Sequence, residues 1–438
     1  MRRLRALPLF LTALIVLGQA ALGPVLSAPA AAQDFASPTQ LGPTVVVIVL
    51  DGCPAGSLDL LPGEAFLCAA QRASGCEEGD CLSTVVRTVF PSSTAAGHAA
   101  IFTGRYPEEN GVTGKEYLRA DESLGRFNSP NLLERPTLFE AARDAGFGTA
   151  MMSAKKNVRL MLSGAADVSV GAEEVPDWVL EAVGPPPDES GQYDDYAGWH
   201  VKLDLWVLAA VQAYLEKDYS PAVIGVNLGS PDKCGHRFGP APAEETAAAI
   251  AAISEGLESL AAKLDATRAG NWCMIVTADH GMTRVDKGIT ALDLIDEVAE
   301  STGTEIPVTL DGGVLYVWAE GEAASELAKA LADAEGVAEV IGQDSPEAQA
   351  RRAELHTRHP RTPPLIAVTA SGYMFIESPL FMDYTRGSHG TADLDTDLLV
   401  PLVVYGPRAR DGNAEQLFNA AGSLTDIYGL VMTILGIE

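Results

Sequence analysis

The 438-residue sequence is poor in positive charge and in aromatic residues. Lys and Arg number 30 against 59 Asp and Glu, which gives a formal net charge of −29. A surface this acidic repels phosphate backbones and anionic lipids, so nucleic-acid coating and docking through a polybasic surface are excluded. An anionic substrate therefore needs a local positive centre, such as a metal ion or a group of lysines. Aromatic residues make up 6%, but apolar residues reach 47%, which rules out a disordered or collagen-like chain.

Long apolar runs are scarce after the N-terminus. The first five residues carry three arginines, and an apolar run, Ala6–Leu26, and a small-residue run, Ala28–Ala32, follow. We interpret residues 1–32 as a secretory signal peptide cleaved after Ala32. A retained membrane anchor is the alternative, because the run approaches spanning length, but proline and glycine residues interrupt it. Cleavage would leave an exported periplasmic or extracellular protein of net charge −32, with no stable membrane association.

Cysteines number only six. An oxidising compartment allows disulfides, and six cysteines have fifteen full pairings, among which the sequence does not choose. Cys53, two residues beyond Asp51, is interpreted as a disulfide or a buried thiol rather than as a metal ligand. Cys81 is assigned to a short polar insertion together with Cys68 and Cys76. The sequence carries no information about oligomeric state.

Apolar, β-branched runs alternate with helical patterns along much of the chain. Such runs are typical of buried parallel strands. Their alternation with helices predicts the α/β class, with a mostly parallel central sheet covered by helices on both faces. In such sheets functional residues collect at the carboxyl ends of the strands. The predicted strands are Thr44–Leu50, Gly148–Ser153, Ala222–Leu228, Trp272–Thr277 and Leu398–Tyr405, and the predicted helices are Pro136–Ala145, Trp199–Glu216, Pro242–Thr267 and Leu424–Leu435.

Residues 285–375 have a different pattern. They contain a helical stretch, Ala323–Ala334, short β-like pieces at Val314–Trp318 and Ile366–Ala370, and an arginine-rich stretch, Arg351–Arg361. The pattern of the main sheet resumes at Leu398. We therefore predict a small cap subdomain, residues 285–375, inserted into a catalytic domain of residues 33–284 and 376–438.

Acids and histidines lie next to four predicted strands. Three carboxylates and three imidazoles are groups that zinc accepts, three or four per ion, so the set and a nucleophile suit a pair of zinc ions. Each motif alone is weak, because an aspartate after a strand is usually a turn residue or a helix cap. Their joint occurrence favours a metal site. The residues are Asp51, Asp232, His236, Asp279, His280 and His389.

A nucleophile is expected in the segment Phe90–His98, where Ser93 and Thr94 precede a helical pattern. A hydroxyl at a helix start is most often only an N-cap. The same position also favours an anion, and a metal-bound hydroxyl loses its proton readily. The formal charges of two Zn²⁺ ions, three carboxylates and one alkoxide cancel, so the site could accept a phosphoryl group.

These motifs resemble the alkaline phosphatase superfamily, and within it the type I phosphodiesterase/nucleotide pyrophosphatase family. The matching pieces are Leu50-Asp51-Gly52, Thr94-x-x-x-His98, Thr103-Gly104-Arg105-Tyr106-Pro107, Asp232-x-x-x-His236, Asp279-His280-Gly281-Met282 and Gly387-Ser388-His389-Gly390. The resemblance runs from about residue 44 to the C-terminus and implies an alkaline phosphatase-like fold. It implies that the ligands of one zinc are Asp51, Thr94, Asp279 and His280, and that those of the second are Asp232, His236 and His389.

The same resemblance implies the mechanism. Thr94, by its spacing to His98, would attack phosphorus in line and form a phospho-threonine intermediate, with Ser93 as the alternative nucleophile. Water would then hydrolyse the intermediate, and the second zinc would steady the leaving oxygen. Divalent metals other than zinc are an alternative for the same ligands.

Two stretches depart from the nucleotide pyrophosphatase pattern. The family's phosphoryl-binding asparagine is replaced, since the stretch Gly111–Lys115 ends in lysine. Ser153–Asn157 resembles the lysine-bearing loop of phosphonoacetate hydrolases and of threonine-type monoesterase phosphatases. Lys155 matches a substrate-contacting lysine there, while Asn157 replaces a second cation. An ordinary solvated loop explains these lysines equally well. Facing the site, Lys115 and Lys155 would favour a dianionic phosphoryl group or a carboxylated substrate.

The sequence thus predicts an exported two-zinc hydrolase of phosphoric esters or anhydrides, acting on a small phosphorylated substrate. The alternatives are a phosphomonoesterase and a phosphonoacetate-type hydrolase of P–C bonds, with a phosphonate substrate. Sulfatase chemistry is disfavoured, because no Cys/Ser-x-Pro-x-Arg motif occurs in the nucleophile segment. A non-enzymatic binding module is disfavoured, because every metal-site position carries a competent ligand.

Overall fold

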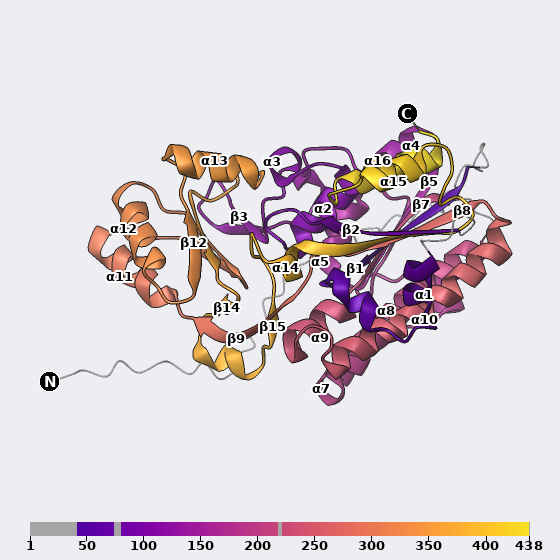
Figure 1. Cartoon of the computed structure of the whole chain (residues 1–438), viewed down its shortest axis with the longest axis horizontal. Coiled ribbons are helices and arrows are strands. Elements are labelled where there is room, and N and C mark those ends of the chain that lie inside the picture. Colours follow the sequence, from indigo (N-terminus) through magenta and orange to yellow (C-terminus); the bar gives the residue numbers. More distant parts are fainter. Residues whose placement is uncertain (1–41, 74–79, 218–220, 438) are drawn as a thin grey trace, which may run out of the picture. The chain divides into compact units, whose positions relative to one another are not determined.

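A seven-stranded sheet forms the centre of the protein (Figure 1). The structure is a computed structural model that describes residues 42–73, 80–217 and 221–437, so the predicted signal peptide and Cys76 lie outside the described residues. The strands in spatial order are β2 (Cys81–Arg87), β16 (Leu399–Tyr405), β8 (Trp272–Thr277), β1 (Thr44–Leu50), β7 (Pro221–Leu228), β5 (Gly148–Ser153) and β6 (Val168–Val170).

The sheet is mostly parallel, as predicted. β8, β1, β7, β5 and β6 run parallel, whereas β16 pairs antiparallel with both β8 and β2. All seven residues of β1 are buried, which explains why its sequence is an uninterrupted run of β-branched and apolar residues. The carboxyl ends of β1, β7 and β8 therefore meet at one edge of the sheet.

Helices cover both faces of this sheet (Figure 1). On one face lie α8 (Tyr196–Glu216) and α10 (Glu244–Arg268), which pack against each other. On the other lie α2 (Thr94–Thr103), α4 (Leu138–Asp144) and α16 (Asp426–Leu435). A capping box between Thr137 and Glu140 starts α4 and explains why Pro136 is not part of the helix.

Further elements connect these layers. They are η1 (Ala55–Leu60), α1 (Phe66–Ala73), α3 (Pro107–Asn110), β3 (Glu116–Leu118), β4 (Leu124–Arg126), η2 (Pro130–Leu132), α5 (Lys156–Leu162), η3 (Ser163–Ala165), α6 (Asp177–Ala182), α7 (Gly191–Asp194), α9 (Ser230–Phe238), η4 (Pro379–Asp383), α14 (Asp395–Leu398) and α15 (Ala414–Ala420). Within the part of the chain that the structure describes, no helix has both the length and the apolar character needed to cross a bilayer.

A second, four-stranded antiparallel sheet lies within residues 308–369. Its order is β10 (Val308–Asp311), β11 (Val314–Val317), β13 (Leu365–Thr369) and β12 (Val337–Ile341). The helices of this region are α11 (Leu292–Thr302), α12 (Gly321–Ala332) and α13 (Pro346–Glu354). Apolar clusters separate from the main core fill it. The cap limits given above stay a prediction, because β9 (Thr283–Ile289) crosses residue 285 and pairs with both β14 (Gly372–Phe375) and β15 (Gly387–Ser388).

Cysteines show one departure from the sequence expectation. Cys81 opens β2, an edge strand of the main sheet, rather than lying in a polar insertion. Its alternating polar residues and exposed Val85 give β2 a weaker apolar signal than the inner strands. The five described cysteines are buried free thiols, and burial raises the pKa of Cys53 to about 12. Cys53 is therefore a buried thiol.

Candidate active site

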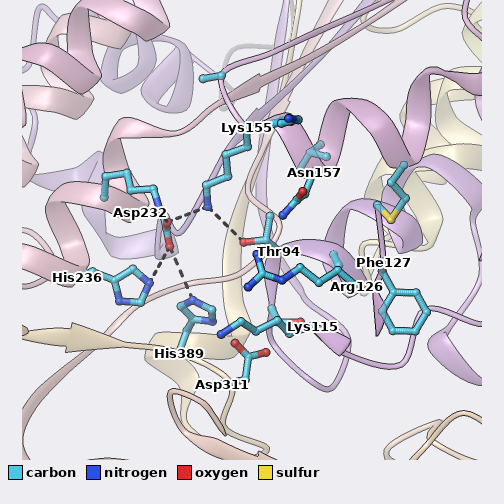
Figure 2. A pocket seen from close by; sticks show the side chains of 17 residues that line it. Thr94, Lys115, Arg126, Phe127, Lys155, Asn157, Asp232, His236, Asp311 and His389 are labelled. Atoms are coloured by element: carbon cyan, nitrogen blue, oxygen red, sulfur yellow. Dashed lines mark hydrogen bonds and ion pairs between the residues drawn. The ribbon is translucent and has the colours of Figure 1, made fainter. Parts of the chain in front are cut away.

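Thr94 opens α2 and faces a cavity of about 470 Å³, hereafter the threonine cavity (Figure 2). Its Oγ1 lies 3.3 Å from Asp51 Oδ1 and 3.3 Å from His280 Nε2. The preceding Ser93 is the N-cap residue, but its hydroxyl makes no cap hydrogen bond and is buried without a hydrogen-bond partner among the described residues. Thr94 is therefore the hydroxyl that reaches the predicted ligands of the first metal.

The first candidate cluster is held by the ends of β1 and β8. Asp279 Oδ1 accepts hydrogen bonds from the backbone N–H groups of Gly52 (3.1 Å) and His280 (3.0 Å), which leaves Oδ2 3.6 Å from His280 Nε2. Asp51 Oδ1 lies 3.6 Å from the same nitrogen. Gly52 has φ +68°, and a Cβ there would lie 2.9 Å from the Asp232 Cα. Glycine thus allows the segments of the two clusters to approach each other.

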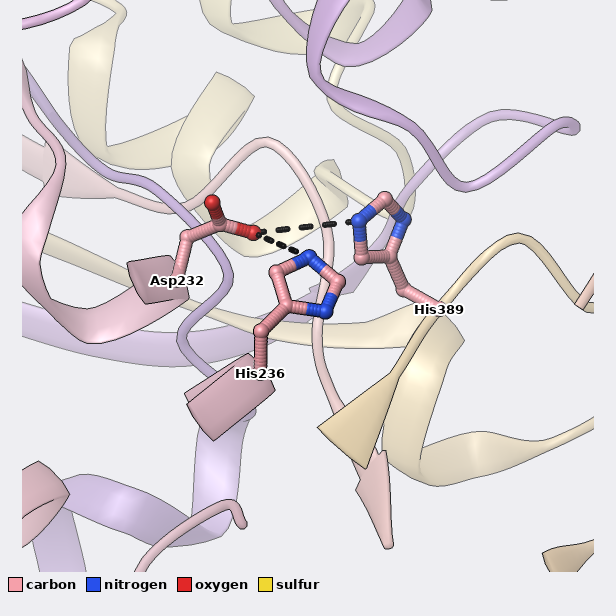
Figure 3. Close-up of side chains that lie close together, drawn as sticks. All are labelled: Asp232, His236 and His389. Carbon is pink, nitrogen blue, oxygen red and sulfur yellow. Dashed lines mark ion pairs between the residues drawn. The ribbon is translucent and has the colours of Figure 1, made fainter. Parts of the chain in front are cut away.

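The second candidate cluster joins α9 to the segment before β16 (Figure 3). Asp232 Oδ1 lies 3.1 Å from His236 Nε2 and 3.7 Å from His389 Nε2. Asp232 and His236 are four residues apart in α9, so they share one face of that helix. The groups Asp232–His236–His389 and Asp51–Asp232–His280 both bring three ligand atoms within 4.8 Å of one another.

The three candidate histidines use their second ring nitrogen in the same way. Each Nδ1 lies within hydrogen-bonding distance of a backbone carbonyl: His236 at 2.9 Å from Gly387, His280 at 2.8 Å from Gly281 and His389 at 2.8 Å from Ser92. A proton on each Nδ1 would form a hydrogen bond to the carbonyl oxygen. The unprotonated Nε2 would then direct its lone pair toward the carboxylates. Metal-binding histidines are oriented in this manner in proteins.

A divalent metal fits this donor set. Asp232 Oδ1 and Asp279 Oδ2 are buried and have no hydrogen-bond partner among the described residues, although imidazole nitrogens lie close to both. Asp232 Oδ1 faces His236 Nε2 at 3.1 Å and Asp279 Oδ2 faces His280 Nε2 at 3.6 Å. With the proton of each ring on Nδ1, the oxygen and nitrogen of each pair are both acceptors, which is unfavourable in a buried site. A cation between them would remove that cost. Oxygen and imidazole ligands match zinc and similar divalent ions.

Lys155 lies between Asp232 and Thr94 (Figure 2). Its ammonium is 2.7 Å from Asp51 Oδ1, 2.7 Å from Asp232 Oδ2 and 3.3 Å from Thr94 Oγ1. Its side chain is 17% exposed, so the solvated-loop alternative is wrong for this lysine. One carboxylate from each cluster thus contacts the Lys155 ammonium, and a divalent metal bound to these carboxylates would compete with it.

Burial and mutual charge set the protonation of the site. Burial, reinforced by Asp279, raises the pKa of Asp51. Burial also opposes ionisation of Asp232, but Lys155 and His236 hold the pKa of its carboxyl well below its usual value. For His280, burial favours the neutral ring, yet the surrounding carboxylates raise its pKa. A metal binds the neutral ring, so metal binding at His280 would release a proton.

Lys115 has a different place from Lys155. It lines the threonine cavity, and its Nζ donates to the carbonyl oxygen of Leu310 at 3.3 Å. It is therefore at the rim and, unlike Lys155, makes no hydrogen bond to Thr94 among those found in the described residues. Asn157 and Arg126 also line this cavity.

Four further residues of the site were not predicted from the sequence to take part in catalysis or metal binding, although His98 was expected to pack or to form hydrogen bonds. Asn227, in β7, donates to Asp51 Oδ2 at 2.9 Å, and its amide nitrogen lies 3.1 Å from His98 Nε2. His98 Nδ1 lies 2.8 Å from the Thr94 carbonyl and 3.1 Å from Asp279 Oδ2. Asp204 accepts from the N–H groups of Gly229 (2.7 Å) and Ser230 (2.8 Å), and so anchors the start of α9. Asp311 lines the cavity, and its buried Oδ2 has no partner among the described residues.

A polar residue inside an apolar strand or helix was the signal available for two of these. Asn227 interrupts the apolar run of β7, and Asp204 lies within the apolar sequence of α8. Neither pattern predicts which residue the polar side chain contacts, because the contact depends on how distant elements pack together.

The fold is shared with solved structures of phosphorus-handling enzymes. A phosphonoacetate hydrolase from Sinorhizobium meliloti in complex with phosphonoformate matches with a TM-score of 0.65 at 20% identity, over 90% of this chain and 96% of that chain. Murine ectonucleotide pyrophosphatase/phosphodiesterase 5 in complex with AMP matches with a TM-score of 0.64 at 19% identity, with the same coverage. These likenesses establish an alkaline phosphatase-like fold.

Sequence similarity points in the same direction. Human ectonucleotide pyrophosphatase/phosphodiesterase family member 7 is 27% identical over 250 residues, which are 56% of this chain and 51% of the relative. The mouse protein of the same name is 24% identical over 250 residues. The match thus spans about half the length of these curated relatives. The profile of the family described as type I phosphodiesterase / nucleotide pyrophosphatase matches residues 45–392, and the chain belongs to that family.

Proposed function

We propose that the protein is an exported two-zinc hydrolase of phosphoric esters or anhydrides, similar to phosphodiesterases and nucleotide pyrophosphatases, that acts through a phospho-threonine intermediate. The observation that carries the proposal is the position of Thr94, whose hydroxyl lies 3.3 Å from both Asp51 Oδ1 and His280 Nε2. Family membership supports the reaction class. Export is supported by the signal-like layout of residues 1–32, which lie outside the described part of the chain.

The zinc ligands are proposed from the donor geometry. Asp51, Thr94, Asp279 and His280 would hold one ion, and Asp232, His236 and His389 would hold the second. When bound, the two ions would supply positive charge that lowers the pKa of a hydroxyl and stabilises the oxygens of a phosphoryl group. The backbone carbonyls on the three Nδ1 atoms keep the rings oriented for this role.

The protein's own groups account for attack and positioning. Thr94 Oγ1 forms a bond to phosphorus while the bond to the leaving oxygen breaks on the opposite side, and the threonine proton passes to solvent. The leaving oxygen takes up a proton from solvent. Water then attacks the phospho-threonine, which restores the hydroxyl and releases phosphate from a monoester or a phosphomonoester from a diester. The Lys155 ammonium lies 3.3 Å from Thr94 Oγ1, and once metal ions take Asp51 and Asp232 it would be available to donate to a phosphoryl oxygen beside Thr94.

Lys155 also supports a second candidate, a phosphomonoesterase. Two zinc ions balance three carboxylates and one alkoxide, so the lysine adds a positive charge to a site that is already neutral. Added charge favours a dianionic monoester over a monoanionic diester. The same charge would suit a carboxylated phosphonate, which keeps P–C bond hydrolysis as an alternative.

One experiment tests the reaction class and the metals together. Purified protein is analysed for metal content and assayed with 4-nitrophenyl phosphate and bis(4-nitrophenyl) phosphate, before and after chelation. We expect about two zinc ions per chain and loss of turnover on chelation. Active protein containing only a trace of divalent metal would refute the metal proposal. Zinc-loaded protein that hydrolyses neither ester would refute the reaction class. Intact residues 1–32 on protein recovered from the cell exterior would argue against cleavage.

A further inference from the structure

A second cavity adjoins the threonine cavity. It has a volume of about 320 Å³ and shares the side chains of Lys115, His236, Asp311 and His389 with the threonine cavity. Figure 2 shows Lys115, Asp311 and His389 next to one another on this shared wall. Thr94 lines the threonine cavity and does not line the second one. The two spaces thus meet at the Asp232–His236–His389 cluster.

The walls of the second cavity are largely apolar. They come from the end of β10, from β14 and the residues after it, and from η4. Met374, Phe375 and Ile376 are buried and form a fixed wall, while Phe381 is 52% exposed. The apolar lining residues are Leu310, Met374, Phe375, Ile376 and Phe381. Such a surface gains free energy by covering an apolar group.

Charge is distributed unequally between the two spaces. The threonine cavity is lined by five cationic side chains against the two carboxylates of Asp232 and Asp311. The second cavity is lined by one cation, Lys115, and by the carboxylates of Asp311 and Glu377. A metal ion on His236 and His389 would add the same charge to both spaces, so the remaining side chains make the first cavity more favourable for an anionic group than the second. The cations of the threonine cavity are Lys115, Arg126, Lys155, Lys156 and Lys233.

The geometry of in-line displacement indicates which part of the substrate would lie at the second cavity. With Thr94 attacking from one side of phosphorus, the leaving oxygen departs on the other side. Lys155 Nζ is 3.3 Å from Thr94 Oγ1 and 2.7 Å from Asp232 Oδ2, so a phosphoryl group beside this ammonium lies between Thr94 and the Asp232–His236–His389 cluster. The leaving group then emerges at the wall that both cavities share.

We propose that the second cavity is the leaving-group site and that it takes an uncharged, apolar alcohol or phenol rather than a phosphate. The inference rests on the proposed hydrolysis of phosphoric esters and deepens it by defining the leaving group. The P–O bond to this group breaks as Thr94 binds phosphorus, and the leaving oxygen takes up a proton from solvent to depart as the alcohol. An anhydride, whose leaving group is a phosphate anion, is disfavoured by Asp311 and Glu377.

Phe381 offers a substitution with a matched control. It and Leu380 are neighbours in η4 and are both exposed, at 52% and 70%. Only Phe381 lines the cavity. Phe381→Ser and Leu380→Ser therefore remove similar apolar groups from the same exposed turn, and neither opens a hole in a buried core.

The test compares ethyl phosphate with hexyl phosphate. Both transfer the same phosphoryl group and release alcohols of similar acidity, so the comparison isolates the apolar contact of four extra methylenes. We expect the zinc-loaded wild type to favour hexyl phosphate by roughly tenfold in kcat/KM, because the cavity is partly open. Phe381→Ser should lower that preference by about threefold or more, and Leu380→Ser should leave it unchanged. Glu377→Gln should raise the turnover of pyrophosphate relative to hexyl phosphate by about threefold.

The results separate this inference from the proposed function. Equal kcat/KM values for ethyl and hexyl phosphate, or equal effects of Phe381→Ser and Leu380→Ser, would overturn the leaving-group site while leaving the reaction class intact. Failure to hydrolyse any ester would instead refute the proposed function. In that case, the leaving-group site is tested by binding instead of turnover. The affinity for 4-fluorophenyl phosphate is measured by ¹⁹F NMR on proteins that carry Thr94→Ala. Weaker binding on adding Phe381→Ser but not Leu380→Ser supports the site, and unchanged or undetectable binding overturns it.

Discussion

The guanidinium of Arg361 donates a 2.9 Å hydrogen bond to the carbonyl oxygen of Gly111. The same group donates to the carbonyl of Leu132 at 2.7 Å and pairs with Glu134 at 3.1 Å. Lys115 lies four residues after Gly111, so a side chain from the segment after α13 holds the loop that brings this lysine to the cavity rim.

Replacing Arg361 by alanine should weaken the fold. Two partly buried carbonyls would lose their donor, which costs about 1–3 kcal/mol of unfolding free energy. Arg358→Ala is the control, because Arg358 is 55% exposed and its pair among the described residues is a 3.6 Å contact with Glu108. Its loss should therefore cost no more than about 0.5 kcal/mol. Urea unfolding of both variants measures the difference. Similar midpoints for the two would show that the guanidinium contacts contribute no net stability.

Thr94→Ala should separate catalysis from helix stability. We expect turnover of 4-nitrophenyl phosphate to fall by about a thousandfold or more, because the attacking oxygen is removed. Thr94 is the first residue of α2 and not its N-cap, and its hydroxyl makes only long contacts of 3.3 Å, so its loss should cost only about 1 kcal/mol of unfolding free energy. Ser93→Ala is the matched comparison, since the Ser93 hydroxyl has no hydrogen-bond partner among the described residues. A Ser93→Ala variant that is inactive beside an active Thr94→Ala variant would transfer the nucleophilic role to Ser93.

Neutralising Lys155 should change substrate preference. Lys155→Ala removes a cation 3.3 Å from Thr94 Oγ1, and we expect kcat/KM for a monoester to fall by about ten- to hundredfold, more than for a diester with the same leaving group. Lys115→Ala should have a smaller effect in the same direction, because its ammonium lies at the rim against the Leu310 carbonyl. Paired assays on 4-nitrophenyl phosphate and bis(4-nitrophenyl) phosphate measure both. Equal losses on the two esters would mean that neither lysine discriminates by charge.

Asp204 should make stability depend on pH. Burial raises the pKa of its carboxyl to about 6, above the value of 3.8 for an exposed aspartate. The folded state then holds the proton more tightly than the unfolded state, so this residue's contribution to stability falls as pH rises from about 4 to about 6. The change is on the order of 2–3 kcal/mol.

The comparison variant for this effect is Asp204→Asn. Asparagine does not titrate, so the difference in unfolding free energy between wild type and variant should change between about pH 4 and pH 6. The amide oxygen can keep only one of the two hydrogen bonds from Gly229 and Ser230, which lowers the stability of the variant by an amount that does not depend on pH. Urea unfolding at several pH values on the metal-loaded proteins gives the difference. Parallel profiles from pH 4 to 6 would argue against a raised pKa.

The inner strands could be predicted closely from the sequence, whereas the sheet edge could not. β1 and β8 have the predicted bounds, because strands buried on both faces require unbroken apolar runs. Within the described part of the chain β2 pairs with β16 alone and has partly exposed residues, so its sequence alternates and carries a weaker apolar signal. Leu398, predicted to begin the last strand, ends α14 instead.

The candidate site could be predicted for residues next to strand ends and not for residues held by distant partners. Asp51, Asp279 and His280 converge because β1 and β8 are neighbours in the sheet. The direction of Lys155 could not be deduced, since a lysine pair in a loop has the same local sequence whether it faces solvent or a cleft. The hydrogen bonds from its ammonium to Asp51 and Asp232, which come from distant parts of the sequence, fix its direction.

The position of β16 has a consequence for synthesis on the ribosome. Among the strands that the structure describes, β16 alone pairs with β2, and it also covers the edge of β8 that faces away from β1. A nascent chain that has emerged as far as residue 398 therefore has an unpaired strand, β2, and an unpaired edge on β8. Unpaired edges recruit other chains. We expect the growing polypeptide to need chaperone protection until residues 399–405 emerge and complete the sheet.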